Sequence, residues 1–260
     1  MTPRVTVVPT LAVMAELYRL PKDGGAESSR FAAYVRHAAT TWGMSSYNPM
    51  AGPHAAESVA ALLALDAEGA AFRAATAAAR ELGWEDEATL AVVVLSPGMW
   101  TDRLANGVER IAAAERVAGK GQVVFWTREP VTEADVVREA RAELARVAWT
   151  TQHGRATTLR AVLEREGLAR AIGDVAGPAS EEPWGAVAEM VTRDGALAGL
   201  DRVAPVLFGD AVADTLGWTP RGLPMQAGLR WAAAEARRAM REHGTPAVLT
   251  RTGWLGAASA

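Results

Sequence analysis

The feature that most constrains the fold is a strand–helix–strand–helix pattern between residues 90 and 149. Its first part, LAVVVL at 90–95, is the most apolar short run in the chain, and VVFW at 123–126 is a second such run. Each run is followed by a polar loop and then by apolar residues spaced for a helix, at about 102–117 and 132–151. A helix between two neighbouring strands favours a parallel pair with a right-handed crossover; an antiparallel pair is the alternative.

The rest of the chain is mainly helical in pattern. Apolar residues three or four positions apart predict helices at 11–20, 30–42, 53–82, 158–172 and 224–243, with Gly69 as a break in the third. A strand or an extended arm is expected at 1–8, and AVLT at 247–250 is expected to form an edge strand. We therefore predict a helix-dominated α+β or α/β protein. Its small central sheet has two to four strands and contains a βαβ unit at about 90–127. An all-α fold is the alternative.

The domain organisation follows from length and from one loop. A chain of 260 residues is long enough for one large domain, or for one domain with a smaller appendage. The Gly-, Pro- and Ser-containing loop at 173–185 is the best candidate boundary. We expect a main domain at 1–175, and a helical C-terminal part at 176–260 that packs on the same core.

Composition excludes several kinds of partner. Cysteine is absent, which rules out disulfides, thiolate catalysis and thiolate metal sites. The net charge of −3 and the lack of a basic block argue against nucleic acid. No run approaches the ~20 apolar residues that cross a bilayer, and the N-terminal apolar stretch is too short for a signal peptide. We therefore expect a cytoplasmic protein without a membrane partner, whose alanine-rich helices could also pack between copies in a homo-oligomer.

The first candidate site lies in the loops after the two apolar runs. If the strands are parallel, both loops lie at the edge of the sheet where α/β proteins place their ligands. Arginines there would bind an anionic group, Asp102 or Glu129 would serve as the general acid or base, and tryptophans would form apolar walls. The structural alternative is that Thr101 or Asp102 only caps a helix and that the tryptophans border the core. Besides Ser96, the candidates are Trp100, Thr101, Asp102, Arg103, Arg110, Trp126, Arg128 and Glu129.

The second candidate site is the loop at 42–54, which contains Tyr47, Asn48 and His54. It leads into a helix expected to begin at Pro53, and the unpaired N–H groups at a helix N-terminus favour anions. The structural alternative is that Asn48 opens a turn and His54 only assists the cap.

Several common site motifs are absent. The four histidines, His37, His54, His153 and His243, lack the spacing of a dedicated metal site. A phosphate-binding P-loop, a nucleophile elbow and a dinucleotide-binding glycine motif are also missing, so no cofactor is indicated.

Together these features predict an enzyme that acts on a small polar or anionic substrate at the carboxyl ends of two strands, by general acid/base chemistry. One alternative is a non-catalytic ligand-binding or oligomeric assembly protein. A weaker one is a metalloprotein whose site combines distant histidines and carboxylates.

Overall fold

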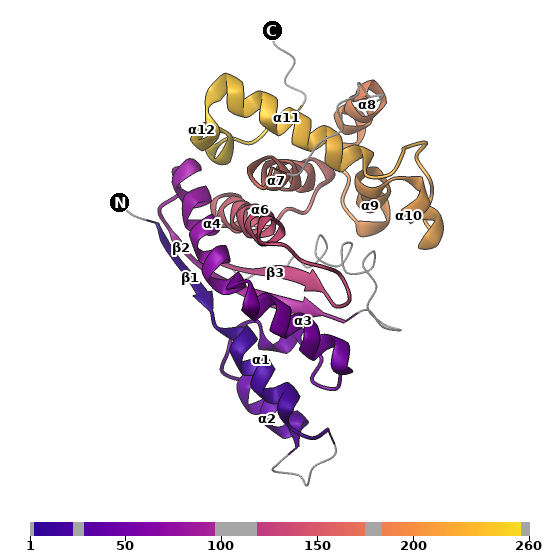
Figure 1. Ribbon diagram of the computed structural model, residues 1–260. Helices are drawn as coiled ribbons and strands as arrows, with labels where there is room; N and C mark the ends of the chain where they lie inside the picture. Colours follow the sequence, from indigo (N-terminus) through magenta and orange to yellow (C-terminus); the bar gives the residue numbers. More distant parts are fainter. Residues whose placement is uncertain (1–2, 23–28, 97–118, 175–183, 256–260) are drawn as a thin grey trace.

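A small parallel sheet lies at the centre of a mostly helical molecule (Figure 1). The computed structural model describes residues 3–22, 29–96, 119–174 and 184–255. Within them the strands β1 (Arg4–Val8), β2 (Glu87–Leu95) and β3 (Lys120–Trp126) follow the order β1-β2-β3, and both pairings are parallel. The predicted fold class is confirmed, and the antiparallel and all-α alternatives are wrong. The helix expected at about 102–117 lies outside the described residues.

The described helices fall before β2 and after β3 in the chain. Before β2 they are α1 (Thr10–Arg19), α2 (Arg30–Ala38), the 3₁₀ turn η1 (Met44–Ser46), α3 (Pro53–Ala64) and α4 (Ala67–Glu81). After β3 they are α6 (Glu133–His153), α7 (Leu159–Ile172), α8 (Trp184–Asp194), α9 (Leu200–Phe208), α10 (Asp210–Thr215), α11 (Ala227–His243) and α12 (Thr245–Thr250). Within the described ranges, none of these helices is long and apolar enough to span a bilayer.

Small residues bring helices and sheet close together. The alanines of α4 that face the interior pack against α6, so the alanine-rich surface is buried within one chain. At Gly121 of β3 an added Cβ would lie 2.7 Å from Val147 and 2.8 Å from the Glu143 carboxylate, both on α6. Helix α6 therefore lies directly on β3, and its first turns are held near the carboxyl end of that strand.

The later helices form successive layers away from the sheet. Figure 1 shows α6, then α7, then α11 at increasing distance from β3. Helix α7 is buried on nearly every side, and Gly167 makes its contact with α11 close, since a Cβ there would lie 2.5 Å from the Ala232 carbonyl oxygen. The expected domain boundary near 175 stays a prediction. One cluster of buried residues nevertheless includes both Val5 and Leu255.

Two local expectations differ from the structure. The run AVLT belongs to α12 and not to an edge strand, because Pro246 fits the first turn of a helix and Val248 and Leu249 bury one side of it. The long helix at 53–82 breaks at Asp66, with φ of +50°, and not at Gly69. A Cβ at Gly69 would lie 2.3 Å from the Asp66 carboxylate, so the glycine makes room for the residue at the break.

Candidate functional site

The carboxyl ends of β2 and β3 lie side by side, as the parallel pairing requires. Leu95 is the register partner of Trp126, and the Thr127 N–H donates to the Leu95 carbonyl at 2.9 Å. The loops that follow the two strands therefore start from one point on the sheet edge. The candidates on the first loop and on the helix expected after it lie outside the described residues, and their roles stay predictions: Trp100, Thr101, Asp102, Arg103 and Arg110.

The second loop makes a tight turn directly after β3. The Glu129 N–H donates to the Trp126 carbonyl at 3.4 Å, and Arg128 is exposed with a φ of +68°. A non-glycine residue rarely adopts this left-handed conformation, and such strain is common near functional sites. Thr127 is buried, and its hydroxyl has no hydrogen-bond partner among the described residues.

Helix α6 begins with a capping box that fixes its first turn over the end of β3. The Thr132 hydroxyl accepts from the Asp135 N–H at 3.2 Å, and the Asp135 carboxylate accepts from the Thr132 N–H at 2.9 Å. The Thr132 hydroxyl also donates to the Asp135 carboxylate at 2.6 Å. This bond, followed by the bond from the Thr132 N–H and the contact with Arg138, lowers the pKa of Asp135. Arg138 pairs with Asp135 and lies 4.0 Å from a Glu139 carboxylate oxygen, so its charge is shared by two acids.

A pocket of about 430 Å³ opens at this end of β3. Trp126 and Glu129 come from the strand end and its loop, and Arg138 and Glu139 come from α6. The polar lining is completed by Asp135 of α6, Arg170 near the end of α7 and Gln226 just before α11. The pocket therefore joins the predicted loop to helices that are distant in sequence.

Arg170 is an incompletely paired charge in this pocket. Among the described residues its one hydrogen bond goes to the Gln226 side-chain oxygen at 3.4 Å, and it has no ion pair within 4 Å. Burial lowers the pKa of Arg170, and the nearby Glu166 carboxylate offsets only part of that effect. A guanidinium carries five N–H donors, so most of those on Arg170 remain available to a ligand.

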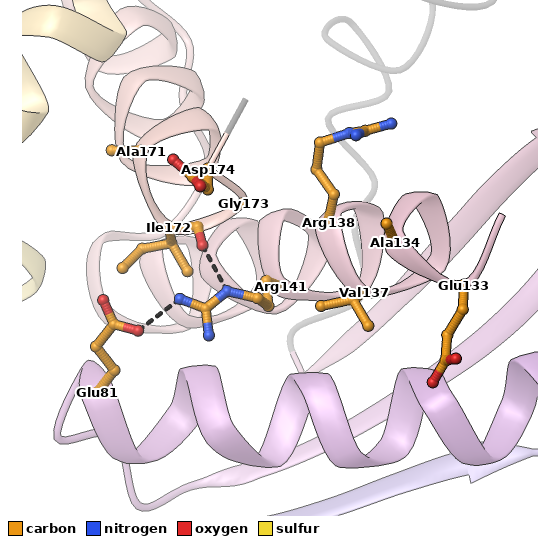
Figure 2. Close-up of a pocket in the computed structure, with 10 residues that line it drawn as sticks. All are labelled: Glu81, Glu133, Ala134, Val137, Arg138, Arg141, Ala171, Ile172, Gly173 and Asp174. Atoms are coloured by element: carbon orange, nitrogen blue, oxygen red, sulfur yellow. Dashed lines mark hydrogen bonds and ion pairs between the residues drawn. The ribbon is translucent and has the colours of Figure 1, made fainter. Parts of the chain in front are cut away.

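A larger cavity of about 770 Å³ lies on the other side of α6, between α4 and the end of α7 (Figure 2). Arg141 is central to it, and this side chain donates to the Glu81 carboxylate at 2.6 Å and to the Ile172 carbonyl at 2.7 Å. Figure 2 shows Arg138 pointing away from that pair. This cavity is larger than the pocket at the end of β3, but its central cation, Arg141, is already bonded to Glu81 and Ile172.

The three candidates in the loop at 42–54 differ in burial. Tyr47 is buried and donates to the Val92 carbonyl at 2.7 Å, and burial raises the pKa of its hydroxyl. Asn48 is exposed, and its side-chain oxygen accepts from the Met50 N–H at 2.9 Å in a turn. His54 is half-buried, and its Nε2 lies 2.9 Å from the Ser96 hydroxyl. Of the three, only His54 connects this loop to the end of β2.

The polar residues that complete the pocket were not among the sequence candidates. Arg138 had a usable signal, because it lies in the second turn of a helix expected to start directly after β3. Arg170 and Gln226 had none, since they are 56 residues apart and meet only through the packing of α7 on α11.

Neither a metal-binding cluster nor a similar known protein indicates what the site binds. The described residues contain no group of three or more histidines and carboxylates placed to hold a metal ion. No protein-family model, curated protein or solved structure matches the chain.

Proposed function

We propose that the chain is an enzyme that binds a small molecule with an anionic group in the strand-end pocket and acts on it by general acid/base chemistry. The proposal rests on the half-buried Arg170, which lines the pocket and has one long hydrogen bond and no ion pair among the described residues. A partly buried cation with unused donors is costly to the folded protein unless a ligand supplies the missing acceptor. A carboxylate or phosphate can take two parallel N–H bonds from one guanidinium, and so meets this need directly.

The remaining charges of the pocket suggest what else the ligand carries. Arg138 is paired with Asp135 and close to Glu139, so it adds little attraction for a second anionic group. Glu129 and Glu139 bring carboxylates to the lining, and these favour N–H or O–H donors. A small molecule with one anionic group and one amine or hydroxyl matches this pattern, and about 430 Å³ lies within the usual range for small-ligand sites.

The catalytic step is assigned to a carboxylate at the strand end. Glu129 follows the turn after β3 and lines the pocket, so it is the described candidate for the general base. Half-buried Trp126 provides an apolar wall beside it. Asp102, Arg103 and Trp100 lie outside the described residues, and we retain them as proposed acid/base, anion-binding and wall residues, respectively.

Two alternative functions are non-catalytic ligand binding and assembly into an oligomer. Non-catalytic binding would use the same pocket and differs only in the absence of turnover. The buried alanines of α4 pack within the chain. These alanines are therefore not exposed for packing between copies, which weakens the hypothesis of assembly through alanine-rich faces.

The proposal is tested by changing Arg170→Gln and measuring binding calorimetrically with three probes: inorganic phosphate, succinate and L-serine. We expect the unchanged protein to bind at least one probe at millimolar concentration. Loss of a charge-assisted bond of about 1.5–3 kcal/mol should weaken binding by about ten- to a hundredfold. Arg141→Gln is the matched control, because it removes a paired arginine from the neighbouring cavity and should leave binding intact. Equal binding by Arg170→Gln and the unchanged protein would contradict the proposal.

A further inference from the structure

A serine and a histidine from distant parts of the chain meet at the carboxyl end of β2. His54 lies in the first turn of α3, Ser96 directly follows the last residue of β2, and the two are 42 positions apart. The His54 Nε2 and the Ser96 Oγ are separated by 2.9 Å, within the range expected between a nucleophile and its base. Both residues are half-buried, so solvent and small reagents can reach them.

The surrounding backbone holds both partners in place. Ser96 follows Leu95, whose carbonyl accepts the Thr127 N–H and so ties the strand end to β3. On the other side, a Cβ at Gly52 would lie 3.0 Å from the His54 Nδ1 and 3.1 Å from its Cε1. The backbone at Gly52 therefore borders the imidazole ring, and the absence of a side chain there leaves room for it.

The start of α3 also favours negative charge beside this pair. Pro53 occupies the first turn, and Gly52 provides no side-chain hydrogen bond to the helix N-terminus. The positive end of the helix dipole is thus uncapped by a side chain next to His54. An oxyanion that develops during acyl transfer would be stabilised in such a place.

From these three observations we propose that Ser96 and His54 form a nucleophile–base pair that hydrolyses small carboxylic esters. His54 takes the hydroxyl proton on Nε2 as the Ser96 Oγ forms a bond to the ester carbonyl carbon. The bond from that carbon to the alkoxy oxygen then breaks, and the alcohol leaves with the proton from His54. Water attacks the acyl-serine in the same way, which releases the carboxylic acid and returns the proton to Ser96.

The pair works as a dyad and is independent of the strand-end pocket. No carboxylate among the described residues is hydrogen-bonded to His54, so the ring lacks the orienting group of a complete triad there. The pair shares no residue with the Arg170 pocket, so failure of one proposal leaves the other standing.

A cysteine-free chain permits a direct test that needs no substrate. Ser96→Cys introduces the only thiol, and its alkylation by iodoacetamide can be followed by mass spectrometry. We expect it to react about a hundredfold faster than Ser58→Cys, a matched control one turn along α3. The Ser58 hydroxyl donates to the His54 backbone carbonyl at 3.0 Å and, among the described residues, does not bond to the imidazole. Adding His54→Gln should reduce the rate of Ser96→Cys to that of the control.

The native serine is tested with a fluorophosphonate probe and with p-nitrophenyl acetate. In the probe reaction the Ser96 Oγ–P bond forms and fluoride leaves, so we expect an adduct on the peptide that contains Ser96. Both this adduct and an acylation burst should be lost in Ser96→Ala and His54→Gln and kept in Ser58→Ala, with circular dichroism checking that each variant is folded. Equal alkylation rates at positions 96 and 58, or a burst that survives in folded Ser96→Ala, would overturn the proposal.

Discussion

Two half-buried arginines near the interface of α6 and α7 have opposite surroundings. Arg146 on α6 donates to the Glu166 carboxylate at 3.0 Å and to the Glu143 carboxylate at 3.2 Å. Burial alone would lower its pKa, but the two carboxylates more than offset that effect and raise it. Arg170 on α7 has one long bond to Gln226, and its pKa is lowered. The charge of Arg146 is therefore stabilised by two carboxylates, whereas the charge of Arg170 has no ion pair among the described residues.

The difference separates an arginine that belongs to the fold from one that is available to a ligand. Glu166 lies one helical turn before Arg170, yet its oxygens are used by Arg146 and by Arg165, at 3.0 Å each. The desolvation cost of a buried ion pair is offset by the attraction between its charges when the geometry is good, whereas a cation that lacks an anionic partner has no such offset. Arg146 should thus matter mainly for stability, and Arg170 mainly for binding.

The largest expected effect is that of Arg146→Met. This change leaves the carboxylates of Glu143 and Glu166 buried without their shared cation, so we expect a loss of about 3–5 kcal/mol in the free energy of unfolding. Urea denaturation followed by circular dichroism measures it. Arg170→Met is the matched control and should cost less than about 1 kcal/mol, since it also removes an unfavourably buried charge. Similar losses in the two variants would mean that the two environments are equivalent in energy.

The second effect concerns the helix that holds Arg170 beside Gln226. Gly167→Ala would place a methyl group 2.5 Å from the Ala232 carbonyl oxygen, which belongs to the backbone of α11 and cannot rotate away. We expect a loss of about 1–3 kcal/mol from overpacking, together with weaker probe binding as α7 and α11 move apart.

The matched control for that change is Gly185→Ala, another glycine inside a helix. Among the described residues outside its own stretch of helix, no atom lies within 4 Å of the added Cβ at Gly185. The better helix propensity of alanine should therefore stabilise the protein by up to about 1 kcal/mol. If Gly167→Ala behaved like this control, the close contact of α7 with α11 would not constrain the pocket.

Local chemistry explains which parts of the fold could be predicted from the sequence. The strands β2 and β3 were found because buried parallel strands are continuous apolar runs, and α6 because Thr132 and Asp135 have capping-box spacing. The helix break at Asp66 and the helix at AVLT were not found. Both depend on how a short segment packs, and residue preferences alone do not determine that.

The site could be predicted only where it depends on strand topology. The parallel register places Trp126 and Glu129 at the same edge as Ser96, as expected from two strands and a connecting helix. Arg170 and Gln226 reach that edge only after α6, α7 and α11 have packed in layers. The bond between His54 and Ser96 likewise needs the start of α3 to lie against the end of β2.

The smallest expected effect concerns two carboxylates of α7, Glu164 and Glu166, which differ in the same way as the two arginines. Glu164 is buried, and its one hydrogen bond within the described residues is from the Gly253 N–H, at 2.7 Å. Burial raises the pKa of Glu164 above its ordinary 4.5, and the Gly253 N–H and Arg160 offset only part of the shift. The folded state therefore binds this proton more tightly than the unfolded state does. Its contribution to stability falls as the pH rises from the ordinary pKa through the raised one.

Replacing the group by Glu164→Gln keeps a side-chain oxygen for Gly253 and removes the ionisation. We expect the variant to match the unchanged protein below about pH 4, where the carboxyl is neutral, and to become the more stable of the two as the pH rises to 7. Urea denaturation at a series of pH values gives the difference, in which titration of the other carboxylates cancels. Glu166→Gln should show the opposite sign at pH 7, because the charge that it removes is held by Arg146 and Arg165. Two carboxylates two residues apart would then be distinguished by whether a side chain of opposite charge is bonded to them. The same difference, with the signs of charge reversed, separates Arg146 from Arg170.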